Sequence, residues 1–171
     1  MVSLNQTQNR KVLLYNGMRR NILLFFIALL SFVFIACETS TVYYHFESTP
    51  ISGWERNDTL KFSVPALKAA GGYREDISLR LNSDYPFMGL TLIVDQTVFP
   101  GRRHVSDTVN CRVVDQDGNV KGRGIGFYEY DYPLTHLKLK AGDSLQINVR
   151  HNMKREILPG VADIGIKVTR N

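Results

Sequence analysis

Side chains that carry oxygen recur at every second position in Asp115-Gln116-Asp117-Gly118-Asn119, a spacing that could bind calcium. An EF-hand loop needs a glycine at position 6 and a bidentate glutamate at position 12. Here Gly118 falls at position 4 and Gly126 at position 12. We therefore expect a hairpin turn with Gly118 at positive φ, and no metal site.

The histidines show no spacing that is typical of a metal or catalytic site. They are His45, His104, His136 and His151, and none lies in an HExxH motif or at i, i+4 to another. We expect each of them to be a surface residue or a polar residue with a hydrogen-bond partner.

Other catalytic patterns are also missing from the sequence. There is no GxSxG elbow and no P-loop, and the glycines of 122–126 are not followed by a helical pattern. The scattered carboxylates Asp84, Asp95 and Asp107 would support hydrolysis only if two of them met in a cleft at a glycosidase separation. The sequence therefore predicts that the protein is not an enzyme and has no cofactor.

Aromatic side chains form the most suggestive set for binding. Tyr128, Tyr130 and Tyr132 alternate along an extended segment and should share one face. A one-sided tyrosine row is unusual for a dry core, because each hydroxyl needs a partner. Exposed aromatics can stack on sugars or anchor a protein partner, whereas core packing is the alternative for about half of them. The candidate binding residues are Trp54, Tyr85, Tyr128, Tyr130 and Tyr132.

The N-terminal segment decides in which compartment this chemistry operates. Residues 22–36 read ILLFFIALLSFVFIA, and Ser31 is the only polar residue among these 15. A transmembrane helix needs about 20 apolar residues, whereas the core of a signal peptide has roughly 7–15. Arg19 and Arg20 precede the run, as the positive region of a signal peptide does. The sequence therefore predicts a signal peptide over residues 1–36.

Cys37 follows the small residue Ala36 at the end of this run, which resembles the lipobox of bacterial lipoproteins. In that class the cysteine is acylated and becomes the first residue of the mature chain. Phe34 departs from the pattern, since leucine is usual three residues before the cysteine. The alternatives are an uncleaved short anchor and an ordinary secretory signal. Residues 1–17 are polar and long for a signal peptide, so we place the start of translation at Met18.

Processing would remove most of the positive charge. The whole chain carries 21 Lys and Arg against 16 Asp and Glu, and residues 1–36 hold four basic residues and no acidic one. The mature chain is thus left with a net charge of +1, which does not favour nucleic acid as a partner. Once Cys37 is lipidated, Cys111 has no partner in the chain, and we expect it to pack as a small apolar residue.

The rest of the chain must supply the scaffold. Short runs alternate apolar with polar residues and favour β-branched and aromatic types, at residues 41–46, 59–64, 77–81, 90–99, 105–114, 120–126, 144–149 and 164–168. About eight short strands with frequent turns predict an all-β fold, a jelly-roll-like antiparallel β-sandwich. This domain would occupy residues 42–171, with 37–41 as the lipidated cysteine and its tether.

Four blocks together resemble the gliding motility lipoprotein GldH family of Bacteroidota. They are GWERNDTLKFSVP (53–65), LRLNSDYPFMGLTLIV (79–94), SDTVNCRVVDQDGNVKGRGIG (106–126) and INVRHNMKREILPGVADIGIKV (147–168), and they follow the family's order. The family often has an aromatic residue after the Asp-Gly turn, where this chain has Asn119-Val120-Lys121.

This resemblance implies a non-enzymatic cell-envelope lipoprotein that takes part in surface gliding. Gliding in this phylum is tied to type IX secretion, so the implied partners are envelope proteins of that machinery and, through the lipid anchor, a membrane. The resemblance does not specify the inner or the outer membrane. The alternative function is that of a surface glycan-binding module. The row of Tyr128, Tyr130 and Tyr132 is the observation that favours it.

Overall fold

The structure, a computed structural model, describes residues 41–171. Cys37 and the predicted signal peptide lie outside the described residues. In the described part no helix is long and apolar enough to cross a membrane. Its strands are β1 (Thr41–Ser48), β2 (Trp54–Glu55), β3 (Leu60–Val64), β4 (Gly71–Leu81), β5 (Gly89–Phe99), β6 (Arg103–Arg112), β7 (Tyr128–Leu139), β8 (Ser144–His151), β9 (Ile157–Leu158) and β10 (Val161–Arg170).

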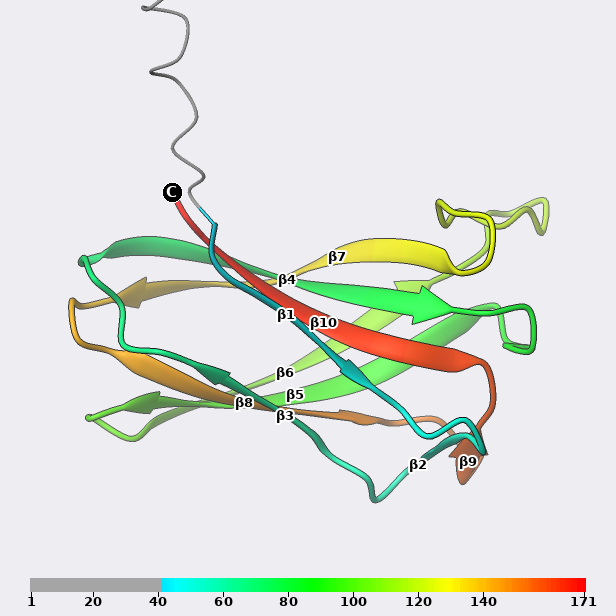
Figure 1. The fold of residues 1–171 in the computed structure, drawn as a ribbon, viewed down its shortest axis with the longest axis horizontal. Coiled ribbons are helices and arrows are strands. Elements are labelled where there is room, and N and C mark those ends of the chain that lie inside the picture. The colour runs from blue at the N-terminus through cyan, green and yellow to red at the C-terminus, as the bar shows by residue number, and fades with distance from the viewer. Residues whose placement is uncertain (1–40) are drawn as a thin grey trace, which may run out of the picture. The chain divides into compact units, whose positions relative to one another are not determined.

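Two four-stranded antiparallel sheets pack face to face (Figure 1). One sheet has the order β1-β10-β4-β7, and the other has the order β3-β8-β5-β6. The two-residue strands β2 and β9 pair beside them as a separate ribbon. With eight long strands in which the first pairs with the last, this order is that of a jelly roll. The predicted all-β sandwich is therefore confirmed.

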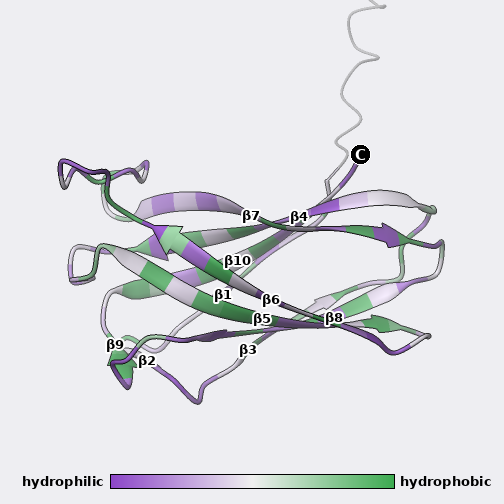
Figure 2. Ribbon diagram, turned by 180° about the vertical axis from the view of Figure 1, so that it is seen from behind, coloured by the Kyte–Doolittle hydropathy of each residue, from purple (hydrophilic) through white to green (hydrophobic). Residues whose placement is uncertain are grey.

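Strict alternation along the strands builds the core. In β5 every second residue from Leu90 to Val98 is buried, and the residues between them are half-exposed. Figure 2 shows the same alternation of hydrophobic and hydrophilic residues in several strands. Because successive side chains point to opposite faces of a strand, one apolar face from each sheet closes the core.

Strand β7 is longer than the sequence suggested, because an irregularity conceals its alternation. The register between β4 and β7 shifts between Glu75 and Asp76, so the buried side of β7 changes from Tyr130 before the shift to Leu137 after it. Pro133 lies near the shift. Proline is tolerated there because β7 is an edge strand, where a missing N–H breaks no central ladder.

The prediction of a strand at residues 120–126 is wrong. Only isolated bridges form, between Val114 and Val120 and between Arg123 and Glu129. Gly124 has a φ of 139°, which is incompatible with a continuous extended ladder. This segment is instead part of a long loop, 113–127.

The sandwich has two ends with different loops (Figure 1). At the first, which we call the entry end, β1 begins and β10 finishes, beside loops 65–70, 100–102 and 140–143. The opposite end, which we call the distal end, carries loops 49–53, 82–88, 113–127 and 152–156. The polypeptide therefore joins the N-terminal segment at one end and presents its longest loop at the other.

Candidate interaction surface

Loops 82–88 and 113–127 build much of the distal end, and hydrogen bonds hold them together. The Val113 N–H donates to the Met88 carbonyl at 3.0 Å, and the Tyr85 hydroxyl donates to the Gly89 carbonyl at 2.8 Å. Gly160 has a φ of 77°, and a Cβ there would collide with the backbone of Tyr85. The close approach of loop 82–88 to the turn between β9 and β10 thus depends on glycine at position 160.

The turn at 115–119 has the predicted conformation. Gly118 has a φ of 84°, and its N–H donates to the Asp115 carbonyl. The Asp115 carboxylate accepts the N–H groups of Asp117 at 2.9 Å and Asn119 at 2.8 Å. Hydrogen bonds from Asn119, first through its side chain, hold the pKa of Asp115 below its usual range. The oxygen-rich motif therefore serves the turn itself.

The tyrosine row shares one face of β7, as predicted, but that face looks into the sandwich. Tyr130 is only 7% exposed, and Tyr128 and Tyr132 are half-buried. Tyr130 and Tyr132 stack with ring centroids 6.4 Å apart, and the Tyr132 hydroxyl donates to the Arg112 carbonyl at 2.7 Å. Gly122 packs against Tyr130 so closely that a Cβ would overlap the ring. The row therefore fastens β7 to β6 and the long loop. Tyr130 is too buried to stack on a sugar, and binding by the half-buried Tyr128 and Tyr132 stays a prediction.

The other two aromatic candidates are also used inside the fold. Trp54 is completely buried, its indole N–H donates to the Asp58 carbonyl at 3.1 Å, and its ring meets His151 edge-on at 5.3 Å. His151 Nε2 donates a hydrogen bond to the Trp54 carbonyl at 3.2 Å, and burial holds the pKa of His151 below its usual value. Tyr85 is half-buried against Phe87. These side chains position the distal loops rather than face outward.

The apolar side chains that do face outward gather at the distal end. Six of the eight large exposed hydrophobic residues of the described chain lie there: Ile51, Met88, Val120, Ile125, Phe127 and Ile157. Ile125 is fully exposed, Met88 is 68% exposed and Phe127 is 52% exposed. None of these six is among the binding residues that the sequence predicts, although Ile125 stands alone between two glycines. We call Met88, Val120, Ile125 and Phe127 the distal apolar set.

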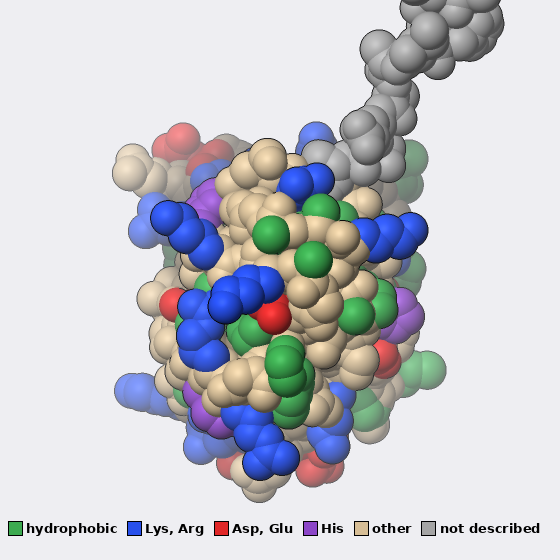
Figure 3. Space-filling view, turned by 90° about the vertical axis from the view of Figure 1, so that its left-hand side faces the viewer, with side chains coloured by type: hydrophobic (Ala, Val, Ile, Leu, Met, Phe, Trp, Pro, Cys, Tyr) green, Lys and Arg blue, Asp and Glu red, His purple; other side chains and the backbone are tan. Residues whose placement is uncertain are grey.

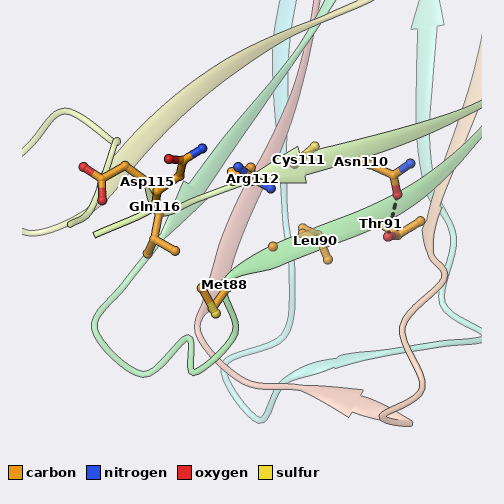
Figure 4. Close-up of a pocket in the computed structure, with 10 residues that line it drawn as sticks. Met88, Leu90, Thr91, Asn110, Cys111, Arg112, Asp115 and Gln116 are labelled. Atoms are coloured by element: carbon orange, nitrogen blue, oxygen red, sulfur yellow. Dashed lines mark hydrogen bonds between the residues drawn. The ribbon is translucent and has the colours of Figure 1, made fainter. Parts of the chain in front are cut away.

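Of the distal apolar set, Met88 lines a hollow of about 660 Å³ (Figure 4). Met88 lines one part of it, and Asp115 and Gln116 of the long loop line another. Thr91 and Asn110 are joined in its wall by a 2.9 Å hydrogen bond. The hollow thus combines an exposed thioether with amide, hydroxyl and charged groups.

The structure does not bring the three scattered carboxylates together. Asp84 lies in loop 82–88, whereas Asp95 lies on the outer face of β5 and accepts a hydrogen bond from Ser106 at 2.6 Å. Asp107 points from β6 toward the core. Their positions on separate faces supply no paired acid and base.

A buried polar cluster inside the sandwich was not foreseen. Glu75 on β4 is 0% exposed, and Gln96 on β5 is 1% exposed. Neither side chain makes a hydrogen bond of normal geometry within residues 41–171, and one oxygen of Asp107 is likewise unpaired. Burial raises the pKa of Glu75 from 4.5 to about 7, the Gln96 side chain opposes the rise, and the charge of Asp107 adds to it.

Two solved structures illustrate the loose likeness of this sandwich to others. A family GH115 4-O-methyl-α-glucuronidase with specificity for decorated arabinogalactans matches 80% of this chain over 18% of its own, at 13% identity and a TM-score of 0.44. The sugar-binding C-terminal domain of EclA matches 79% of this chain over 81% of its own, at 9% identity and a TM-score of 0.34. Similarity at this level carries no functional information.

Sequence relatives are more informative. The model of the GldH lipoprotein family matches residues 41–168. The gliding motility lipoprotein GldH of Flavobacterium johnsoniae is 27% identical over 147 residues, which cover 82% of this chain and 91% of that protein. The GldH homolog of Christiangramia forsetii is 22% identical over 148 residues, covering 81% and 90% of the two chains. The chain belongs to the GldH lipoprotein family.

Proposed function

We propose that this protein is a non-enzymatic lipoprotein of the cell envelope that binds a protein of the gliding or type IX secretion machinery. Acylation of Cys37 anchors it to a membrane, and the distal end carries the contact with the partner. Membership of the GldH lipoprotein family supports the anchor and the link with gliding.

The observation that carries the binding role is the exposure of the distal apolar set. Isolated exposed apolar residues are common on protein surfaces. Here four of them come from two hydrogen-bonded loops beside a hollow. Burying such side chains against a partner is favourable by about 25 cal/mol per Å², and a few central apolar residues carry most of the affinity of an interface.

Photo-crosslinking in intact cells tests this surface. We expect a benzoylphenylalanine at position 127 to capture a specific envelope protein, because the native side chain there is aromatic and 52% exposed. The double variant Ile125→Asp and Phe127→Asp should lower recovery of that partner about tenfold or more. Its thermal stability should stay near that of the wild type, because both side chains are exposed.

A crosslinker at Thr108, exposed on the outer face of β6, is the matched control. Capture of the same proteins from positions 108 and 127 would count against a distal contact. So would undiminished recovery by the double aspartate variant.

The anchor is tested by Cys37→Ser. We expect the wild type to fractionate with membranes and the variant to appear in the soluble fraction, because serine offers no thiol for acylation. Mass spectrometry of the N-terminal peptide should show an acylated Cys37 in the wild type. A variant that stays in the membrane would indicate an uncleaved anchor, and a soluble wild type would indicate an ordinary secretory signal.

A further inference from the structure

The entry end of the sandwich is strongly basic. Figure 3 looks onto this end, and its Lys and Arg side chains clearly outnumber its acidic ones. Seven exposed basic residues belong to it: Lys68, Arg74, Arg102, Arg103, Lys138, Lys140 and Arg170. Two acidic residues of the same segments reach the surface, Asp76 and Asp143, whereas Glu75 is completely buried.

Hydrogen bonds show that these segments meet. The Leu67 N–H donates to the Asp143 carbonyl at 2.8 Å, which joins loop 65–70 to loop 140–143. The Arg103 guanidinium on β6 donates to the Lys138 carbonyl on β7 at 3.4 Å, and this hydrogen bond links the two sheets. The Arg170 guanidinium donates to the Ala70 carbonyl at 3.0 Å. The basic side chains therefore form one surface although they are scattered through the sequence.

Both acids at this end are already engaged. The Asp143 carboxylate accepts the Lys140 N–H at 2.8 Å, and Asp76 pairs with Arg74 at 3.0 Å. Within residues 41–171, the side chains of Lys68, Lys138 and Lys140 make no ion pair. Their charge is therefore available to an external anion.

The distal half is nearly balanced. Its basic residues are Arg56, Lys61, Arg80, Arg112, Lys121, Arg123, Arg150, Lys154 and Arg155, against Glu47, Glu55, Asp58, Asp84, Asp115, Asp117, Glu129, Asp131, Glu156 and Asp163. The nearly neutral mature chain thus conceals a separation of charge along the sandwich.

The short distance in sequence between Cys37 and β1 indicates which end of the sandwich lies near a membrane. Cys37 precedes Thr41 by four residues, which can span at most about 14 Å. Thr41 opens β1 at the entry end. An acyl chain on Cys37 would therefore hold the basic surface close to the bilayer, at a distance comparable with the screening length of about 8–10 Å.

We propose that the entry end docks on anionic phospholipid headgroups of the leaflet that holds the Cys37 anchor. This inference rests on the lipidation put forward above. The lipid anchor supplies the attachment, and attraction between the basic surface and anionic headgroups decides which end of the sandwich faces the membrane. Docking also fixes orientation, so that the distal apolar set points away from the membrane toward its partner.

Fluorescence quenching in vesicles tests the docking. The lipidated full chain carries a fluorophore on Gly101→Cys, because position 101 has open space around it and lies in the entry-end loop 100–102. Cys111 does not compete for the label, since it is 2% exposed and burial raises its thiol pKa to about 12. We expect a nitroxide on the headgroup to quench this label severalfold more in phosphatidylglycerol-containing vesicles than in pure phosphatidylcholine, and high salt to abolish the difference.

Charge variants give the matched comparison. Each lysine near an anionic surface favours docking by about fivefold, so the triple variant Lys68→Gln, Lys138→Gln and Lys140→Gln should lower the docked-to-free ratio on the order of a hundredfold. The distal triple variant Lys121→Gln, Lys154→Gln and Arg155→Gln should behave as wild type. A label at Gly126→Cys, in the long distal loop, should report little quenching in either vesicle.

The outcomes separate the anchor from the docking. A chain that sediments with vesicles but shows equal quenching at position 101 in neutral and anionic lipid overturns the docking and leaves the anchor intact. Stronger quenching at position 126 than at 101 overturns it as well. A chain that lacks acyl groups by mass spectrometry and leaves the vesicles contradicts the anchor instead.

Discussion

Replacing Trp54 with alanine is expected to lower the free energy of unfolding by about 3–5 kcal/mol, the usual cost of truncating a buried aromatic side chain. Trp54 is 0% exposed, donates a hydrogen bond to Asp58 and packs edge-on against His151. Its removal would leave a cavity beside the ribbon of β2 and β9. Urea unfolding followed by far-UV circular dichroism measures the loss, since the substitution removes the single tryptophan.

This variant also decides between the two roles that Trp54 could have. If Trp54 binds the partner, as the sequence predicts, Trp54→Ala should lower the recovery of the partner and leave the stability of the protein unchanged. If Trp54 is a core residue, as the structure shows, Trp54→Ala should lower the stability of the protein, and Trp54→Phe should lower it less. Phe127→Ala is the control, because that ring is 52% exposed and its loss should change stability by about 0.5 kcal/mol or less.

The contribution of Glu75 to stability is expected to fall as the pH rises from about 4.5 to about 7, whereas His151, whose pKa burial lowers, contributes in the opposite direction. The pKa of Glu75 is 4.5 in the unfolded reference and about 7 in the fold. Between these pH values the carboxyl group has released its proton in the unfolded state and has kept it in the folded state. Raising the pH therefore lowers the free energy of the unfolded state relative to the folded state. The contribution of Glu75 is fully present below pH 4.5, is lost up to about pH 7 and amounts to about 3 kcal/mol.

Glu75→Gln should remove this slope, because glutamine has no proton to release over that range. Asp107→Asn should reduce it, because the negative charge of Asp107 contributes to the raised pKa of Glu75. Asp117→Asn, on the exposed turn, is the matched control and should leave the slope unchanged. Urea unfolding at a series of pH values measures all four proteins, and an unaltered slope in Glu75→Gln would contradict the assignment.

The fold was readable in the sequence wherever alternation was regular. Strand β5 and strand β8 follow the expected period of two, and the Asp115–Asn119 turn forms as its residues require. Strand β7 was only partly readable, because the irregularity opposite Glu75 changes the phase of its buried residues. The glycines of 122–126 looked like part of a strand, and their backbone instead lets a loop fold against Tyr130.

The surface was much less predictable than the fold. The alternation of side chains predicts that Tyr128, Tyr130 and Tyr132 share one face of a strand, but it does not predict which of the two faces is buried. Which face is covered depends on the opposite sheet, and that sheet buries the tyrosine side. The exposure of Ile125 and the burial of Trp54 were likewise set by neighbours that are distant in the sequence.

The sequence by itself determined the all-β sandwich and the near-neutral charge of residues 37–171, and it predicted the lipid anchor at Cys37, because each depends on local pattern or on composition. The tertiary structure alone decided where charge and apolar surface lie. Strands that run antiparallel carry Lys68, Arg102 and Lys140, which are far apart in the chain, to one end of the sandwich, and the distal apolar set to the other. Composition is a sum over residues, whereas a surface depends on their positions, and only the order of the strands supplies those.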